Sequence, residues 1–104
     1  MSVSNVYYNP EDFGLKVIAE LNDPHASWDF QDTVFWTDGT RVYGASDSGC
    51  SCPSPFESYN SIAELEVIPD LAAARKLTEF CAYRPEDVSE ALRAVEAALK
   101  GQVN

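Results

Sequence analysis

The sequence predicts a small α+β domain in which a three-stranded antiparallel sheet packs against two C-terminal helices. Three observations favour this class. Residues 15–21 alternate between apolar and polar side chains, an aspartate–glycine pair divides a stretch rich in aromatic and β-branched residues, and the last third carries apolar residues at helical spacing. A chain of 104 residues suits one domain, so we expect a single domain over 1–104.

The first strand is expected over residues 15–21. Lys16 and Glu20 lie on one side in this pattern, and the period of two is typical of a half-buried strand. An Asn-Asp-Pro-His sequence follows and would end the strand. The apolar residues expected to share the other face are Leu15, Val17, Ala19 and Leu21.

The second and third strands are expected over residues 28–37 and 40–46, where they form a hairpin. Asp38 and Gly39 stand between them, and this dipeptide is preferred in a two-residue type I′ turn. In that register the cross-strand pairs are Thr37–Thr40, Trp36–Arg41, Phe35–Val42 and Val34–Tyr43.

The hairpin would place large aromatic and aliphatic side chains on one face. We expect this face to form the core beneath the helices, because a sheet of this size needs one covered face. Basic residues do not interleave with the aromatic ones, so the pattern of a single-stranded nucleic-acid site is missing. The residues on this face are Trp28, Phe30, Val34, Trp36 and Tyr43.

The central part of the chain, residues 47–60, is expected to be a loop because it contains two prolines, one glycine and four serines. Ser61 and Glu64 have the spacing of a capping box, which favours a short helix over residues 62–67, with an edge strand as the alternative. The chain therefore divides into a sheet region (1–46), this loop and a helical region (61–104).

Two helices are predicted over residues 70–82 and 85–100. Asp70 can cap the first, and Pro85 suits the first position of the second. The apolar stripe of the second helix can pack on the sheet or on a second copy of the chain, which leaves a monomer or a homodimer open; packing on the sheet is the simpler arrangement. This stripe consists of Val88, Leu92, Val95 and Leu99.

The chain is strongly acidic, with a net charge of -10 from 17 acidic and 7 basic residues. Such a charge opposes contact with phosphate backbones and anionic lipids, so no direct binding to nucleic acid or to a membrane is expected. No apolar run reaches the ~20 residues that span a bilayer, and the N-terminus lacks the pattern of a signal peptide. We therefore expect a cytoplasmic protein whose three cysteines are reduced.

The loop around Cys50 and Cys52 is a candidate metal site. Two thiols one residue apart can share a soft metal, and His25 is a further ligand for zinc. The remaining ligands would have to come from Asp47 or Cys81, because no second cysteine or histidine pair exists. This incomplete set favours the alternative that both cysteines are small apolar groups in a tight loop, and no cofactor is predicted.

Catalytic chemistry is not predicted. Cys50 could be a nucleophile with His25 as its base, but no spacing brings the two together. Acidic pairs such as Asp29 with Asp32 lie in polar stretches and are expected to be solvated, whereas general acid or base work requires a carboxyl group with a raised pKa. We therefore expect no catalytic residues and no enzyme.

A protein-contact surface is the remaining candidate site. Aromatic side chains are enriched at protein interfaces, and several stand on segments expected to be loops. The residues of this predicted aromatic surface are Tyr7, Tyr8, Phe56 and Tyr59.

Three segments resemble a family of small uncharacterised proteins of actinobacteriophages and actinobacteria. These are YNPEDFGL at 8–15, VFW at 34–36 and ASDSGCSCPSPFE at 45–57. The resemblance covers about the first two-thirds of the chain, and the predicted C-terminal helices do not contribute to it. It implies a phage-encoded protein that works in a bacterial cytoplasm, and it implies no activity.

The leading functional hypothesis is a non-enzymatic accessory protein that binds a host or phage protein. One alternative is a small domain stabilised by a metal at Cys50 and Cys52. The other is an acidic nucleic-acid mimic that occupies the basic groove of a host DNA-binding protein, which the acidity of the first 40 residues would permit.

Overall fold

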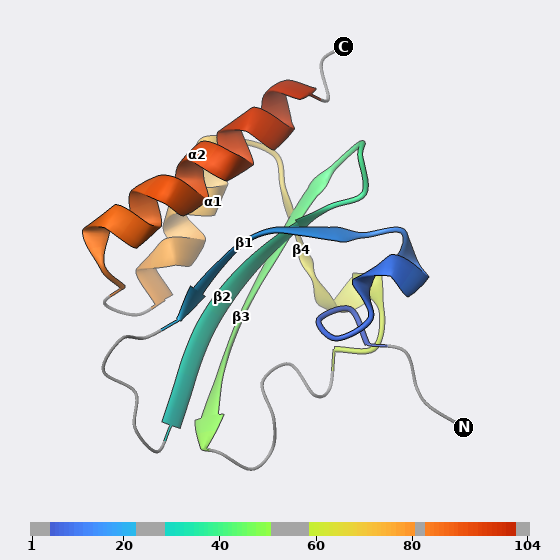
Figure 1. Ribbon diagram of the computed structural model, residues 1–104, viewed down its shortest axis with the longest axis horizontal. Helices are drawn as coiled ribbons and strands as arrows, with labels where there is room; N and C mark the ends of the chain where they lie inside the picture. Colours follow the sequence, from blue (N-terminus) through green and yellow to red (C-terminus); the bar gives the residue numbers. More distant parts are fainter. Residues whose placement is uncertain (1–4, 23–28, 51–58, 81–82, 102–104) are drawn as a thin grey trace.

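Four antiparallel strands form one sheet in the computed structural model, in the order β1-β2-β3-β4, and two helices cover one of its faces (Figure 1). The structure describes residues 5–22, 29–50, 59–80 and 83–101. The elements in chain order are η1 Pro10–Phe13, β1 Lys16–Asn22, β2 Asp29–Thr37, β3 Val42–Cys50, η2 Ile62–Glu64, β4 Glu66–Ile68, α1 Leu71–Leu77, η3 Thr78–Phe80 and α2 Pro85–Gly101.

The predicted α+β class is confirmed, but the sheet has four strands and not three. The additional strand, β4, lies where a short helix or an edge strand was expected, and the η2 turn precedes it. Ile68 of β4 pairs with Val42 and is almost fully buried. A strand of three residues is too short to show a period of two, so its pairing with β3 decides its conformation.

The hairpin turn is longer than predicted. Thr37 pairs with Val42, which leaves residues 38–41 as the turn. The Asp38 carboxylate accepts hydrogen bonds from the backbone N–H groups of Thr40 and Arg41, at 2.8 and 2.7 Å, and so stabilises the longer turn. The register moves by two residues, which keeps Val34, Trp36 and Tyr43 on one face as predicted.

Strand β3 extends further than its composition suggests. It continues through residues 47–50, which were expected to belong to the loop, and Cys50 pairs with Asp29 of β2. Hydrogen bonding to the long strand β2 overrides the low strand propensity of this serine- and glycine-containing stretch. The rest of the predicted loop up to residue 58 lies outside the described residues.

Strand β1 contains a bulge that changes which face its side chains occupy. The register shifts between Val17 and Ala19. Val17 packs with the Trp36 cluster, whereas Ile18 and Ala19 pack with the Phe35 cluster on the opposite face. The prediction of a single apolar face along this strand is therefore wrong.

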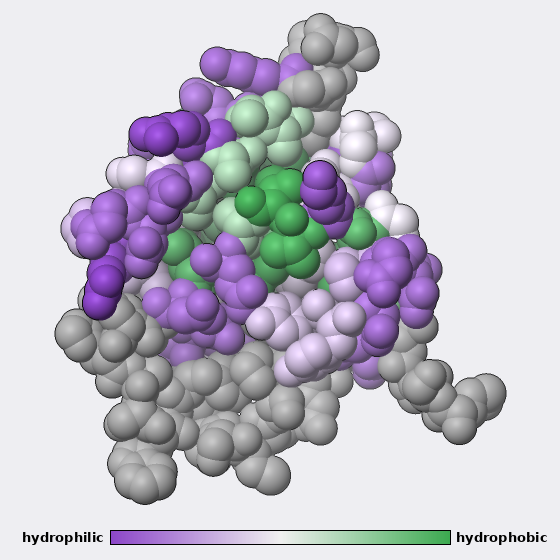
Figure 2. All heavy atoms as spheres, viewed as in Figure 1, coloured by the Kyte–Doolittle hydropathy of each residue, from purple (hydrophilic) through white to green (hydrophobic). Residues whose placement is uncertain are grey.

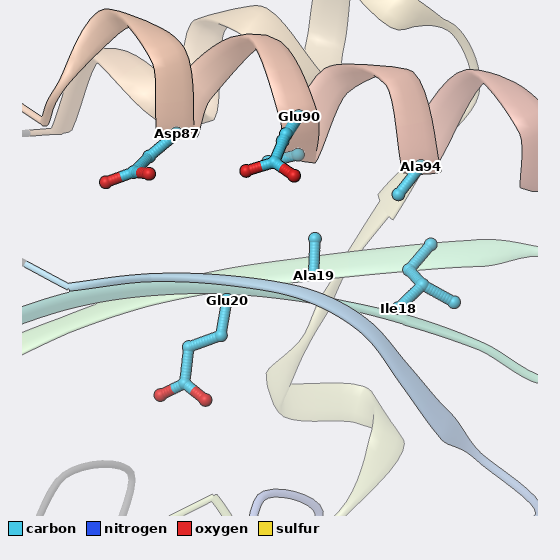
Figure 3. Close-up of a pocket in the computed structure, with 7 residues that line it drawn as sticks. Ile18, Ala19, Glu20, Asp87, Glu90 and Ala94 are labelled. Carbon is cyan, nitrogen blue, oxygen red and sulfur yellow. The ribbon is translucent and has the colours of Figure 1, made fainter.

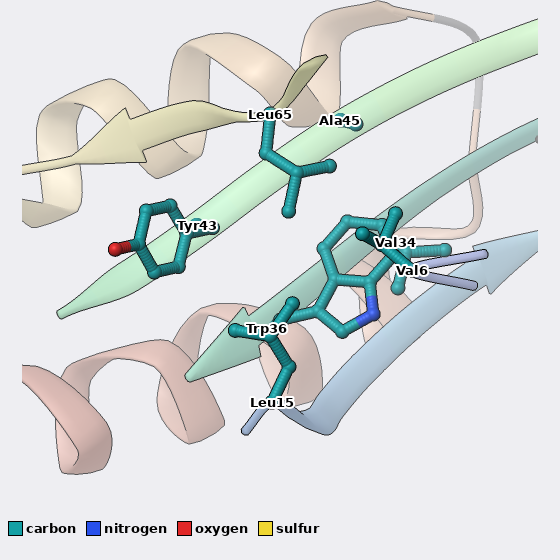
Figure 4. Packing of buried hydrophobic residues seen from close by; sticks show 7 residues of the cluster. All are labelled: Val6, Leu15, Val34, Trp36, Tyr43, Ala45 and Leu65. Atoms are coloured by element: carbon teal, nitrogen blue, oxygen red, sulfur yellow. The ribbon is translucent and has the colours of Figure 1, made fainter. Parts of the chain in front are cut away.

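Both faces of the sheet are covered. Phe35 and Val42 pack against Ala74 of α1 and Val95 of α2. The aromatic face lies on the other side and is covered by Val6 and other apolar residues of irregular segments, so its predicted position beneath the helices is wrong (Figure 4). Trp28 lies outside the described residues. The buried cluster on this face consists of Val6, Leu15, Val34, Trp36, Tyr43, Ala45 and Leu65.

The helices begin where the sequence predicts. The Asp70 side chain accepts a hydrogen bond from the backbone N–H of Ala73 at 2.9 Å and caps α1, which continues into η3. The apolar stripe of α2 packs on the sheet of its own chain, with Val95 fully buried. In the described parts of the chain, no helix is long and apolar enough to cross a membrane.

Candidate binding groove between β1 and α2

Strand β1 forms one edge of the sheet and has β2 as its only neighbouring strand among the described residues. Helix α2 runs antiparallel beside it. Leu21 near the end of β1 packs with Ala91, whereas Ile18 near its start packs in the cluster that contains Ala98. The α2 helix therefore lies alongside β1, and among the described residues no strand lies on the outer side of β1 (Figure 1).

A groove of about 320 Å³ lies between this edge and α2. Its floor is apolar, with alanine side chains from both elements, and Figure 2 shows a hydrophobic area at the centre of this face with hydrophilic side chains around it. The groove is lined by Ile18, Ala19, Glu20, Asp87, Glu90, Ala91 and Ala94.

Three acidic residues and no basic residue line the groove. Asp87 and Glu90 are three residues apart at the start of α2, so they lie on the same side of the helix and point toward the gap. Glu20 projects from β1 away from α2 (Figure 3). The groove therefore has negative charge on both sides of the β1 edge, and it would attract cationic groups.

The Glu20 carboxylate is held by one side chain of the preceding segment and one of β1 itself. The Tyr7 hydroxyl donates a hydrogen bond to its Oε2 at 2.6 Å, and the Asn22 amide lies 3.4 Å from the same oxygen. Burial, and then the hydrogen bond to Glu20, raises the pKa of Tyr7, so this hydroxyl stays protonated and keeps its role as a donor. The position of Glu20 is therefore fixed from the face opposite α2.

Asp32 is a buried polar residue, and its predicted solvated position is wrong. It was expected to be solvated, but it is only 5% exposed and pairs across the sheet with Asp47. Burial raises the pKa of Asp32 above its ordinary value. The hydrogen bond from Asn22 lowers this pKa, and the nearby negative charges of Glu20 and Asp47 raise it. The sequence contained a signal for this burial. Asp32 alternates with Val34 and Trp36 along β2, and alternate residues of a strand lie on the same face of the sheet.

The predicted aromatic surface is only partly exposed. Tyr7 and Tyr59 both pack against the Trp36 cluster, and the Tyr59 hydroxyl donates to the Ser46 carbonyl at 3.2 Å. The Tyr8 ring packs edge-on against the Tyr7 ring, with 4.7 Å between the ring centroids, and Tyr8 is 48% exposed. The structure thus brings three of the four residues to the face opposite the helices, and Phe56 lies outside the described residues.

The predicted metal site falls mostly outside the described residues. His25 and Cys52 lie there, and Cys50 is the last residue of β3. Within the described ranges, no group of three or more histidine, cysteine, aspartate or glutamate residues could hold a metal ion. The metal site stays a prediction.

Sequence reasoning did not find the groove, because its two sides lie about 70 residues apart in the chain. Nothing local in the sequence shows that the acidic start of α2 faces β1. No curated protein and no solved structure matches the chain. A family model described as a domain of unknown function (DUF7574) matches residues 4–104, a range that includes both C-terminal helices. The chain therefore belongs to the family described as Domain of unknown function (DUF7574).

Proposed function

We propose that this protein is a non-enzymatic interaction domain that binds an extended segment of a partner protein along the outer edge of β1. The observation that carries the proposal is the groove itself. A seven-residue edge strand borders a groove with an apolar floor and carboxylates on either side of the strand. A second pocket, of about 260 Å³, includes Glu64 and Glu66 beside the other edge strand, β4, but that strand has only three residues.

An edge strand has backbone N–H and C=O groups that point away from the sheet. These groups can pair with a strand from another protein, which gives affinity, while pockets beside the strand select its side chains. After the bulge, residues 19–22 pair regularly with β2 and can accept a further strand. At the opposite edge of the sheet, β4 has only three residues and offers fewer such groups.

The biological setting is part of the same proposal. The resemblance to proteins of actinobacteriophages and actinobacteria supports an accessory role in a bacterial cytoplasm, with a host or phage protein as the partner. The metal-stabilised domain and the nucleic-acid mimic stay hypotheses, because no observation on the described residues favours either.

Site-specific photo-crosslinking in the natural host tests the proposal. A photoreactive amino acid replaces Ala94, which lines the groove, or Ala97, which is exposed on the same helix and is not among the residues that line the groove. We expect a discrete crosslinked product from position 94 and none from position 97, with the crosslink mapped to one short segment of the partner.

A third position decides between the groove and the predicted aromatic surface. A photoreactive residue in place of Tyr8, which is exposed and contacts Tyr7 beside the Trp36 cluster, reports on the face opposite the helices. Crosslinks from position 8 without any from position 94 would move the interaction to the aromatic surface and reject the groove.

A further inference from the structure

We infer that the segment bound in the groove is a basic strand, in which lysine or arginine side chains alternate with small apolar ones. This inference rests on the proposed function of the groove and names the chemistry of the partner. It follows from the charge of the lining, from the alternation of side chains along a strand and from the shallow floor.

The charge of the lining selects against acidic segments. Asp87 and Glu90 point into the gap and Glu20 lies on the opposite face of β1, and the lining contains no lysine, arginine or histidine. A second copy of this chain would bring the same carboxylates face to face if two β1 edges paired, so repulsion disfavours such self-association. A cationic segment removes this repulsion and gains attraction instead.

The geometry of a strand distributes the basic side chains. Successive side chains of a strand point to opposite faces of the sheet. Ala19 points toward α2 and Glu20 points away from it, so a strand added beside β1 meets carboxylates on both faces (Figure 3). Cations on one face approach Asp87 and Glu90, and a cation on the other approaches Glu20.

Glu20 has an oxygen suited to a partner cation. Among the described residues, its hydrogen bonds come from Tyr7 and Asn22, and both reach Oε2. The second oxygen, Oε1, can then accept from a lysine or arginine. The tyrosine holds the carboxylate in place before binding, which reduces the ordering that the contact requires.

The apolar floor of the groove is the reason to expect small apolar side chains in the bound strand. Ala91 and Ala94 are the helix residues at the bottom of the groove, with Ile18 and Ala19 on the strand side. Methyl groups on both sides leave a shallow surface that a valine-sized side chain covers. Burial of such a side chain contributes binding energy beyond that of the ion pairs.

Fluorescence anisotropy with a labelled peptide of alternating lysine and valine tests the inference. The peptide has about eight residues, a common length for a strand. Its first control replaces every lysine with glutamate. The second methylates alternate backbone nitrogens, which removes hydrogen-bond donors and preserves charge. We expect binding by the lysine peptide alone, with affinity that falls as salt increases.

Variants of α2 separate the groove from the general acidity of the chain. Asp87→Asn and Glu90→Gln each remove one carboxylate of the lining, and we expect each to weaken binding roughly two- to fivefold. Glu96→Gln removes the same charge from the other flank of the helix and should leave the affinity within about twofold. Circular dichroism checks that all three variants remain folded.

Amide chemical shifts locate the peptide. The inference predicts that the largest changes fall on residues 19–22 and on the first turns of α2. Equal losses from Glu90→Gln and Glu96→Gln, with no effect of N-methylation, would show diffuse attraction and overturn the inference.

The inference and the proposed function can fail separately. If the glutamate peptide binds as tightly as the lysine peptide and shifts the same β1 amides, the groove binds strands without selecting basic ones. If no peptide binds and position 94 gives no crosslink, the proposed function itself is wrong.

Discussion

The two faces of the sheet are buried by different means. On one face, α1 and α2 cover Phe35 and Val42 with regular helices. On the other, Trp36 is fully buried beneath irregular segments that precede β1 and β4. Regular secondary structure is therefore not needed to cover a face, provided that apolar side chains from separate segments meet there. Because both faces are covered, the consecutive residues 32–36 are all buried.

The polar groups of the two faces also differ. On the helix-covered face, the Tyr83 hydroxyl lies 2.7 Å from the Thr33 hydroxyl, and both residues are neutral and buried. On the opposite face, Tyr7 bonds to the Glu20 carboxylate near solvent. The irregular face therefore contains hydrogen-bonded carboxylates, Glu20 and Asp32, whereas the Thr33–Tyr83 pair of the helix-covered face consists of hydroxyl groups alone.

The largest expected effect comes from removing one core side chain on each face. Phe35→Ala and Trp36→Ala should each lower the free energy of unfolding by about 3–5 kcal/mol, because both side chains are fully buried. Urea denaturation followed by circular dichroism measures both. Val67, which is 51% exposed, provides the control, and Val67→Ala should cost less than about 1 kcal/mol.

A strong difference between the losses of unfolding free energy in Phe35→Ala and Trp36→Ala would contradict the conclusion that both faces are closely packed. A cost below about 1 kcal/mol for Trp36→Ala would mean that the irregular segments do not form a packed layer.

Matched tyrosine variants should give a smaller difference between the faces. Tyr83→Phe removes a buried partner of Thr33 and should cost about 1–3 kcal/mol. Tyr7→Phe removes the donor to Glu20 at a more exposed position and should cost about 0.5–1.5 kcal/mol. Thermal and urea unfolding of the two variants, measured side by side, give the two losses of stability. A larger loss from Tyr7→Phe than from Tyr83→Phe would contradict this expected difference between the faces.

The smallest expected effect is a pH dependence that arises from Asp32. Burial raises the pKa of this carboxyl group in the folded protein above its ordinary value. Its contribution to stability is therefore full below the ordinary pKa of aspartate, near pH 4, and is lost as pH rises through the raised pKa. Asp32→Asn removes this loss, so the stability of the variant relative to the wild type should increase with pH.

Urea unfolding between about pH 4 and pH 7 measures this trend. Glu79→Gln, at an exposed position on η3, is the matched control and should show no comparable slope. A relative stability of Asp32→Asn that stays flat or falls with pH would contradict the role of burial at this site.

Much of the fold could be predicted because its signals are local. The period of the apolar residues in α2, the cap at Asp70 and the turn signal at Asp38-Gly39 each involve only a few neighbouring residues. The candidate groove could not be predicted in this way. Its carboxylates stand on β1 and at the start of α2, and only their packing brings them to one place.

The sequence by itself determined the α+β class, the approximate positions of the first three strands and both helices, and the shared face of Val34, Trp36 and Tyr43. The tertiary structure decided the longer turn, the bulge after Val17, the fourth strand and the segments that cover each face. The physical reason is the range of the interactions. Local elements depend on residues within one or two turns, whereas register, layering and the groove depend on contacts between distant segments, such as the hydrogen bond between the backbones of Val6 and Tyr59.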